Sequence, residues 1–185
     1  MQPDLQPCNL FNEWVTLHPL KQEDFEQLYA VASDPLIWEQ HPNKNRYRRE
    51  VFENFFKGAI ESGGAFLITN TKTGEPIGSS RFCNYNEAER SIEIGYTFYA
   101  RSCWGKPYNR SAKALMINHA FGFADAVIFH IGAGNIRSQK AIEKIGAVKT
   151  GEESHQYFGE APALNFNYTI RKTDWQSPSA GDLNQ

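Results

Sequence analysis

The chain has 185 residues, of which 41% are hydrophobic and 22% charged, as is typical of one globular domain with a full core. The net charge is −2 and the basic residues are scattered, so nucleic acid is a poor candidate partner. No apolar run reaches the roughly 18–20 residues that span a bilayer, and the first residues lack the features of a secretory signal. Cys8, Cys83 and Cys103 have no paired spacing, which argues against a disulfide framework and a structural zinc site. We therefore expect a cytoplasmic protein without a metal and without a membrane partner.

The first half of the chain predicts a strand, two helices and three further strands. An N-terminal extension covers residues 1–13. The expected elements are a strand at 15–20, helices at 22–32 and 50–61, and strands at 65–69, 76–82 and 91–99. The links between the last three strands are short and rich in turn residues, which favours an antiparallel meander.

The third strand of this meander has a clear alternation. Its apolar positions are Ile92, Ile94, Tyr96 and Phe98. We expect these four residues to share a core face and Glu93 to point to the opposite face.

The second half predicts helices alternating with strands. The expected elements are a helix that begins after residue 110 and carries Ala112, Leu115, Met116 and Phe123 on one face, a strand at 126–131, a helix from Asn135 to about residue 145, and two last strands near Tyr157 and at 165–171. The apolar run at 126–131 indicates a strand buried on both faces. We expect one α/β domain at 14–173, with a mixed sheet flanked by helices, followed by a disordered tail at 174–185.

Two segments carry signals of function. Residues 101–110 contain a glycine turn that opens into a helix, and the amides of a helix N-terminus suit a pyrophosphate. Lys106, Arg110 and Lys113 could add positive charge there, although an ordinary turn with solvated basic residues is the alternative. In residues 135–147, Asn135 is a predicted N-cap, and Ser138 either completes the cap or directs its hydroxyl at a buried ligand.

These segments, EIGYTFYARSCWGKPYNRSAKALMINHAF and NIRSQKAIEKIGAVKTGE, resemble the two acetyl-CoA segments of GNAT acetyltransferases. Within that superfamily the chain is most similar to the branch of ribosomal-protein N-terminal alanine acetyltransferases. The resemblance implies a GNAT-like, mostly antiparallel sheet of about six to seven strands with helices on both faces. It also implies a slot for the pantetheine arm of acetyl-CoA, where the strand from Glu93 to Phe98 separates from residues 128–131.

The resemblance also implies roles for individual residues. The cofactor-binding set is Phe98, Trp104, Gly105, Lys106, Tyr108, Asn109, Arg110, Asn135 and Ser138. Backbone amides from Gly105 to Asn109 would hold the pyrophosphate, and Asn135 would contact the pantetheine arm or hold the local backbone. The chain departs from the family pattern at Ser102, where Arg or Gln is usual, and at Pro107, which has no N–H to offer a phosphate.

Acetyl transfer to an amine needs a neutral nucleophile, a polarised thioester carbonyl and a proton for the departing thiolate. Glu93 is the candidate base, or the carboxylate that orients the ammonium, with an exposed strand carboxylate as the alternative. An amide near Phe98 would polarise the carbonyl, and Ser138 would protonate the sulfur.

The other reactive side chains have simpler interpretations. His119 and His130 lie on apolar elements and are interpreted as core histidines, whereas His155 and Tyr157 are candidates to line the acceptor pocket. Cys103 has no identifiable base for acyl transfer through its sulfur.

The predicted function is transfer of an acetyl group from acetyl-CoA to an amine, either a protein N-terminus or a small molecule, in a ternary complex. A homodimer is left open. The rival functions are a non-catalytic acyl-CoA sensor on the same fold and a phosphate-binding α/β protein unrelated to acyl transfer. The polar loop 41–49 and the final strands are expected to shape the acceptor pocket.

Overall fold

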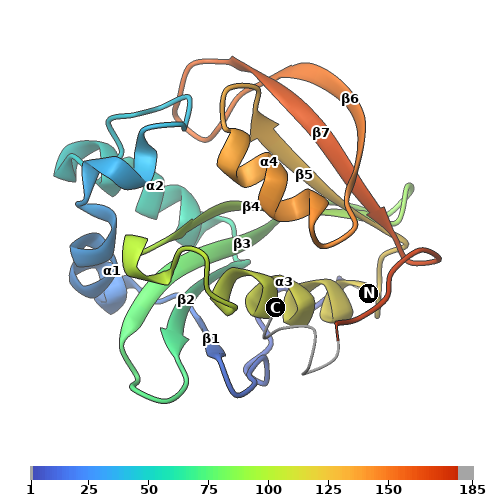
Figure 1. Cartoon of the computed structure of the whole chain (residues 1–185), viewed down its shortest axis with the longest axis horizontal. Coiled ribbons are helices and arrows are strands. Elements are labelled where there is room, and N and C mark those ends of the chain that lie inside the picture. Colours follow the sequence, from blue (N-terminus) through green and yellow to red (C-terminus); the bar gives the residue numbers. More distant parts are fainter. Residues whose placement is uncertain (1, 179–185) are drawn as a thin grey trace.

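A computed structural model describes residues 2–178, and within this range the chain forms a seven-stranded sheet with helices on both faces (Figure 1). The strands are β1 (Val15–Pro19), β2 (Ala65–Asn70), β3 (Pro76–Asn86), β4 (Ser91–Tyr99), β5 (Ala126–Gly132), β6 (Val148–His155) and β7 (Ala163–Arg171). The α-helices are α1 (Phe25–Ala32), α2 (Arg49–Glu61), α3 (Tyr108–Ala120) and α4 (Ile136–Glu143). Three short 3-10 helices are η1 (Gln22–Asp24), η2 (Pro35–Trp38) and η3 (Arg101–Cys103). In this part of the chain no helix is long and apolar enough to cross a membrane.

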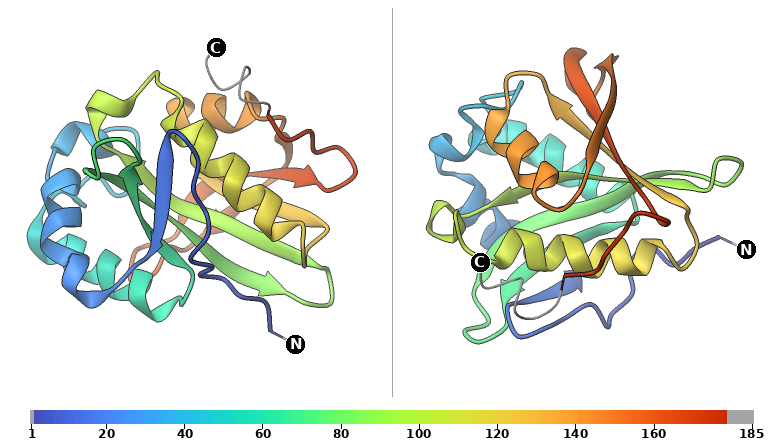
Figure 2. Two further views of the ribbon diagram at one scale, coloured as in Figure 1. Left: turned by 90° about the horizontal axis from the view of Figure 1, so that it is seen from below. Right: turned by 45° about the vertical axis from the view of Figure 1, so that its right-hand side comes forward.

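The strand order is β1-β2-β3-β4-β5-β7-β6, and every neighbouring pair is antiparallel except β4 and β5. The predicted meander and the mixed, mostly antiparallel sheet are thus confirmed. The single parallel pair arises because α3 crosses over between β4 and β5, as a parallel connection requires. Figure 2 shows α3 lying across the sheet close to β1.

The sheet separates two hydrophobic cores. The first core lies under α3 and α4 and includes Met116 and Ile142 from those helices. The second core lies under α1 and α2 and includes Leu28 and Phe52. Because helices cover each face of the sheet at β2, β3 and β4, most residues of these strands are buried on both sides, as in other layered α/β domains.

A β-bulge in β4 changes which face its residues occupy. The register between β3 and β4 shifts next to Tyr96, whose φ is +53°. Ile92 and Ile94 pack in the first core, whereas Phe98 packs in the second. The expectation that these apolar residues share one face is therefore wrong, because the extra residue of the bulge reverses the alternation.

The two parallel strands separate soon after they meet. β4 pairs with β5 only from Ser91 to Glu93, opposite Ala126 to Ile128. Beyond that point β4 and β5 are not paired with each other. Their ribbons diverge in Figure 1. The separation lies where the sequence places the pantetheine slot, and it leaves peptide groups of both strands available to a ligand.

The last strands differ from the sequence prediction. β5 alternates between buried and half-buried residues, so it is covered on one face only. β6 ends at His155, before Tyr157, and most of its side chains are exposed. This edge strand is polar, and its sequence has no apolar alternation from which it could be found.

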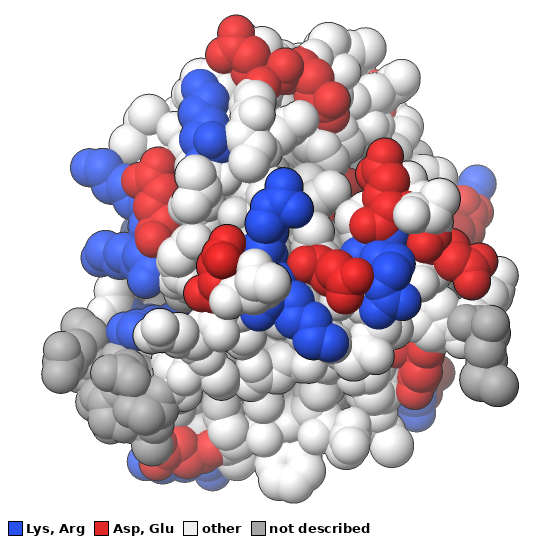
Figure 3. All heavy atoms as spheres, turned by 90° about the vertical axis from the view of Figure 1, so that its right-hand side faces the viewer, with Lys and Arg blue, Asp and Glu red and all other residues white. Residues whose placement is uncertain are grey.

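Residues 174–178, the described part of the expected tail, follow β7. Trp175 packs on Phe121, and its Nε1 donates to Oδ1 of Asn118 in α3 at 2.7 Å. The rest of that expected tail, 179–185, lies outside the described residues. On the face of the molecule shown in Figure 3, acidic and basic side chains are interspersed, so this face has no patch of a single charge.

Candidate active site

Glu93 is the last residue of β4 that pairs with β5, and it points away from the first core. Its side chain is only 2% exposed. Nδ2 of Asn84 donates to Oε2 of Glu93 at 2.6 Å, and Nδ1 of His130 lies 3.1 Å from the same oxygen. Oε1 has no hydrogen-bond partner among the described residues. The candidate base is thus a buried carboxylate with one oxygen held and the other available, and the exposed-carboxylate alternative is wrong.

The available oxygen of Glu93 faces the bulge. A Cβ atom built on Gly95 would lie 3.0 Å from Oε1 of Glu93, so the glycine leaves this oxygen uncovered on that side. Gly95 is followed by Tyr96, the bulge residue with positive φ. Oε1 is therefore directed along β4 toward the segment that has separated from β5.

His130 of β5 lies between two carboxylates. Its Nδ1 is close to Glu93, and its Nε2 lies 3.1 Å from Oε1 of Glu153 on β6. The ring of His155 stacks on His130 with centroids 4.3 Å apart. The interpretation of His130 as a core histidine is wrong, because its face of β5 is covered by polar side chains of β4 and β6 rather than by a helix.

Burial and neighbouring charges shift the pKa values of Glu93 and His130 in opposite directions. Burial raises the pKa of Glu93, but His130 and Asn84 outweigh it, and the net pKa is lowered. Burial lowers the pKa of His130, but Glu93 and Glu153 outweigh it, and the net pKa is raised. For His155 burial dominates and the pKa is lowered. The arrangement therefore favours an ionised Glu93, a cationic His130 and a neutral His155.

The same residues have the atom types of a metal site but not its geometry. Ligand atoms of Glu93, His130 and His155 lie within 4.8 Å of one another. The two imidazole rings are nearly parallel, with an interplanar angle of 12°. An ion bound to a histidine nitrogen lies near the plane of that ring, so two stacked, parallel rings cannot both direct a lone pair at one ion. The cluster suits proton chemistry better than metal binding.

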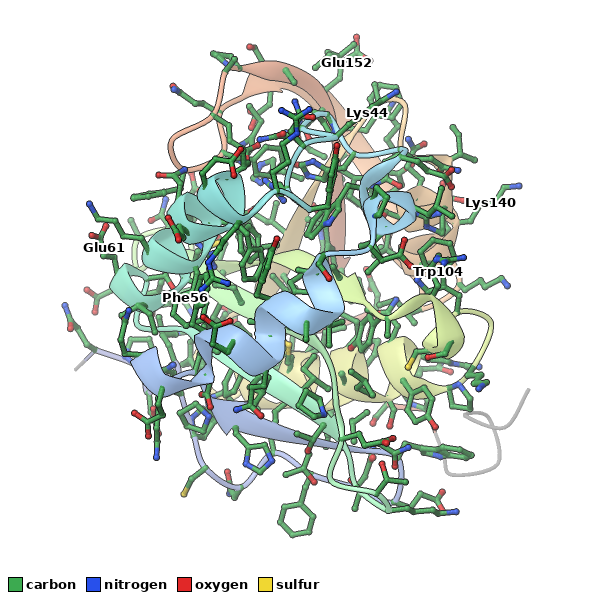
Figure 4. The ribbon with its side chains drawn as sticks, turned by 90° about the vertical axis from the view of Figure 1, so that its left-hand side faces the viewer. Lys44, Phe56, Glu61, Trp104, Lys140 and Glu152 are labelled. Atoms are coloured by element: carbon green, nitrogen blue, oxygen red, sulfur yellow. The ribbon has the colours of Figure 1, made fainter. Side chains whose placement is uncertain are left out.

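Aromatic and charged residues form a wall beside this cluster. Tyr96 and Tyr157 meet edge to face with ring centroids 5.5 Å apart. Arg46, which is 1% exposed, lies over both rings and pairs with Glu160, its Nε 2.6 Å from Oε1. Arg46 belongs to the loop before α2 and Glu160 to the link between β6 and β7. In Figure 4, Lys44 of that loop lies at the same end of the molecule as Glu152 of β6. The loop 41–49 and the last strands thus come together beside Glu93, as expected of the acceptor side.

The turn before α3 retains fewer phosphate donors than the sequence suggests. Gly105 has a φ of +72°, which favours glycine. The amide of Lys106 donates to the carbonyl of Cys103 at 3.3 Å, and Pro107 has no N–H. The first α3 amide bonded to a preceding carbonyl is that of Ser111, which donates to Pro107. The donors left for an anion are therefore the amides of Gly105, Tyr108 and Asn109.

Several predicted cofactor residues use their side chains for packing instead. The Phe98 ring belongs to the second core. The Tyr108 hydroxyl accepts a hydrogen bond from Asn70 at 3.2 Å. The Trp104 ring stacks on the guanidinium of Arg137, 3.8 Å away, and so joins the phosphate turn to α4. In Figure 4, Trp104 and Lys140 of α4 lie on the same side of the molecule. These residues can meet a cofactor through their backbone and their exposed edges.

Lys113 does not reach the phosphate turn. Its side chain is buried, and Nζ donates to the hydroxyls of Ser80 and Thr97 beneath the β4 bulge. Burial lowers the pKa of Lys113 to about 7. The suggestion that Lys113 adds charge at the phosphates is therefore wrong. Lys106 is exposed and remains placed for that role.

The start of α4 separates the two roles predicted for Ser138. Oδ1 of Asn135 accepts a hydrogen bond from the Ser138 amide at 3.2 Å, so Asn135 caps the helix and holds the local backbone. The Ser138 side chain is half-buried and its hydroxyl has no hydrogen bond within the described chain. The cap does not use that hydroxyl.

Two further interpretations from the sequence concern residues outside this site. Nε2 of His119 donates a hydrogen bond to the backbone carbonyl of Asp4 at 2.7 Å, and the ring packs on Phe82 and Phe123, which suits a structural histidine. Cys103 is buried, and burial raises the pKa of its thiol, so it is a poor nucleophile. A surface groove of about 880 Å³ between α1 and η3 includes Ser102 in its lining but neither Glu93 nor Ser138.

Comparison with known proteins decides the family. The model of the acetyltransferase (GNAT) domain matches residues 15–148. The chain belongs to the GNAT acetyltransferase family.

A solved structure assigned as an acetyltransferase is 25% identical, with a TM-score of 0.76 over 91% of this chain and 89% of the other. RimJ of Mycobacterium smegmatis, solved with CoA-disulfide, is 20% identical, with a TM-score of 0.69 over 88% and 85%. A structure assigned as a ribosomal-protein-serine acetyltransferase of Vibrio cholerae is 14% identical, with a TM-score of 0.69 over 92% and 99%. A search of curated proteins gave no match.

GNAT acetyltransferases use acetyl-CoA as the acyl donor, so the family and the general class of activity predicted from the sequence are confirmed. The alanine-specific branch stays a prediction, since the ribosomal-protein enzyme among these structures is named for serine. This GNAT chain offers acetyl-CoA the unpaired edges of β4 and β5 and the free amides before α3. Oδ1 of Asn109 is also buried without a hydrogen-bond partner among the described residues. These groups fit the pantetheine amides and the pyrophosphate.

The sequence did not single out Asn84, Glu153 or Arg46. Asn84 has a φ of +53°, which suits asparagine, but this signal resembles that of any turn. Glu153 is one of several exposed acids on an edge strand, and Arg46 is one of several basic residues in a polar loop. Their roles depend on contacts between distant segments, which spacing along the chain does not reveal.

Proposed function

We propose that this GNAT chain transfers the acetyl group of acetyl-CoA to an amine, a protein N-terminus or a small molecule, by direct attack in a ternary complex. The observation that carries the proposal is the unpartnered Oε1 of Glu93, a buried carboxylate oxygen directed along β4 where this strand leaves β5. A buried carboxylate with one free oxygen can bind an ammonium group and take a proton from it.

The donor would enter between β4 and β5, with its pyrophosphate at the turn around Gly105. A free peptide amide of β4 near Phe98 would donate to the thioester oxygen and polarise the carbonyl. Glu93 takes one proton from the ammonium, and the neutral nitrogen attacks the carbonyl carbon. As the C–S bond breaks, the hydroxyl of Ser138 gives a proton to the sulfur and regains one from the acylated nitrogen through water.

The acceptor side favours a cationic amine. Glu93 and Glu153 supply negative charge, and Tyr96 and Tyr157 supply flat aromatic surface. An α-amine, with a pKa of about 8, is roughly 10% neutral at pH 7, whereas a lysine amine with a pKa of about 10.4 is below ~0.1% neutral. A weak base such as a single carboxylate is therefore better matched to an N-terminal or small-molecule amine than to a lysine side chain.

Binding and turnover are tested separately. CoA and acetyl-CoA at about 1 mM should raise the melting temperature, because a ligand that binds only the folded state stabilises it, whereas NAD and ATP should do much less. Thiol release is then measured with acetyl-CoA and a panel of amines and peptides, and the acetylated product is identified by mass. A melting shift without turnover on any amine would favour the acyl-CoA sensor, and no shift at all would refute the donor assignment.

A further inference from the structure

One histidine joins the buried carboxylate to the molecular surface. Nδ1 of His130 lies 3.1 Å from Oε2 of Glu93, and Nε2 lies 3.1 Å from Oε1 of Glu153. The side chain of Glu93 is 2% exposed and that of Glu153 is 47% exposed. The first contact has the distance of an ion pair without the alignment of a hydrogen bond. Both ring nitrogens thus face carboxylate oxygens, an environment that suits the imidazolium form, in which both nitrogens carry protons.

We propose that His130 is a positioning residue for acetyl transfer, a cation held between Glu93 and Glu153 that keeps Glu93 ionised and leaves its Oε1 free for the acceptor amine. The inference rests on the proposed role of Glu93 in the function above. Without the imidazolium, Glu93 would be a carboxylate buried with only the Asn84 amide for compensation, and burial would favour its neutral form, which cannot take a proton.

The other groups around this pair do not replace the cation. From β6, His155 stacks on His130, and its pKa is lowered by burial, so it stays neutral beside a charged ring. From β3, Cys83 pairs across from Glu93, and burial raises the pKa of its thiol well above the usual value, so it adds no charge. The Tyr157 hydroxyl oxygen lies 2.7 Å from Oδ1 of Asn165 and 3.1 Å from the backbone carbonyl of His130, and burial raises the pKa of Tyr157.

Nearby arginines are directed elsewhere. Arg81 on β3 lies under Tyr96, with its guanidinium carbon 3.8 Å from the ring centroid, and Nη2 donates to the carbonyl of Phe55. Arg46 is paired with Glu160. His130 is therefore the cation in direct contact with Glu93. The lowered pKa of Glu93 and the raised pKa of His130 agree with this assignment.

The test is the pH dependence of kcat/KM for acetyl-CoA between about pH 5 and 9, where histidines and perturbed carboxyls titrate. A substrate amine that stays protonated over the acidic limb serves as the saturating acceptor, so that this limb reports the titration of Glu93 and not that of the amine. In His130→Gln the acidic limb should move up by roughly 1–3 pH units, the effect of removing an opposite charge at this distance. Glu153→Gln should move it in the same direction by less, and His18→Gln, an exposed histidine on β1, should leave it unchanged.

A second measurement, which does not depend on enzyme activity, keeps the inference testable if His130→Gln fails to fold. In the wild type, the imidazole of His130 should titrate by NMR above about 6.5, the unperturbed value, and lower in Glu153→Gln, which changes an exposed side chain. A wild-type His130 that titrates at or below the unperturbed value would overturn the inference. So would a folded His130→Gln enzyme with the wild-type acidic limb while Glu93→Gln is inactive. Glu93→Gln turning over at the wild-type rate would instead overturn the proposed role of Glu93.

Discussion

Ser138→Ala separates a role in the helix cap from a role in catalysis, because the two involve different atoms of this residue. The cap uses the Ser138 amide, which donates to Oδ1 of Asn135 at 3.2 Å and is kept in alanine. The hydroxyl has no hydrogen bond within the described chain, so its removal leaves no buried partner unsatisfied. Alanine is the better helix former by about 0.5 kcal/mol. The free energy of unfolding should therefore stay within about 0.5 kcal/mol of wild type or rise slightly.

The catalytic effect of the same change should be larger. If the hydroxyl protonates the departing thiolate, kcat should fall by roughly 10- to 1,000-fold, with the smaller value expected where water takes over the proton transfer. The affinity for CoA should stay near wild type. Asn135→Ala is the matched control, since it removes the cap oxygen and should cost about 1 kcal/mol of stability. Chemical denaturation, calorimetric CoA binding and steady-state kinetics are measured on one preparation of each variant. Full kcat in a folded Ser138→Ala enzyme would refute the catalytic role.

Three other substitutions test separate parts of the site. Gly105→Val should weaken CoA binding strongly, since a β-branched residue resists a φ of +72°, and a folded variant with normal calorimetric affinity would place the phosphate site elsewhere. Gly95→Ala should lower kcat/KM for the amine by about tenfold and leave the affinity for CoA unchanged, because the Cβ of the alanine would lie 3.0 Å from Oε1 of Glu93. An unchanged kcat/KM would mean that this oxygen does not contact the amine. Lys113 has a pKa of about 7 in the folded chain and about 10.4 in the unfolded chain. Between these values the unfolded chain binds more protons than the folded chain. The wild-type free energy of unfolding should therefore contain a contribution that rises with pH from about 7 to 10. Lys113→Met should lack this term in denaturation curves across that range, and parallel curves for the two proteins would contradict the burial of a titrating amine.

The parts of the fold that follow local rules could be predicted from the sequence. Turn-rich links predicted the meander, and the cap and glycine signals predicted α4 with Asn135 at its start. The slot between β4 and β5 came from family resemblance rather than from spacing, and the pairing that stops at Glu93 agrees with it.

The rest depends on interactions between distant segments. The bulge at Tyr96 inserts one residue into an apparently regular alternation, so the face of Phe98 could not be read from spacing. His130 has an apolar sequence context on β5, but the face on which it lies is set by β4 and β6. The pairing of Arg46 with Glu160 joins residues 114 positions apart and has no local signature.

The central claim is that this chain acetylates an amine and that Glu93 takes the proton. The most direct measurement is CoA release from acetyl-CoA, with mass identification of the N-acetylated product, by wild type and by Glu93→Gln, which has nearly the same shape and no base. The account predicts product from wild type, a kcat lower by about 100-fold or more in the variant, and similar CoA affinity in both. Equal turnover by the two folded proteins, or CoA binding without product from either, would contradict it.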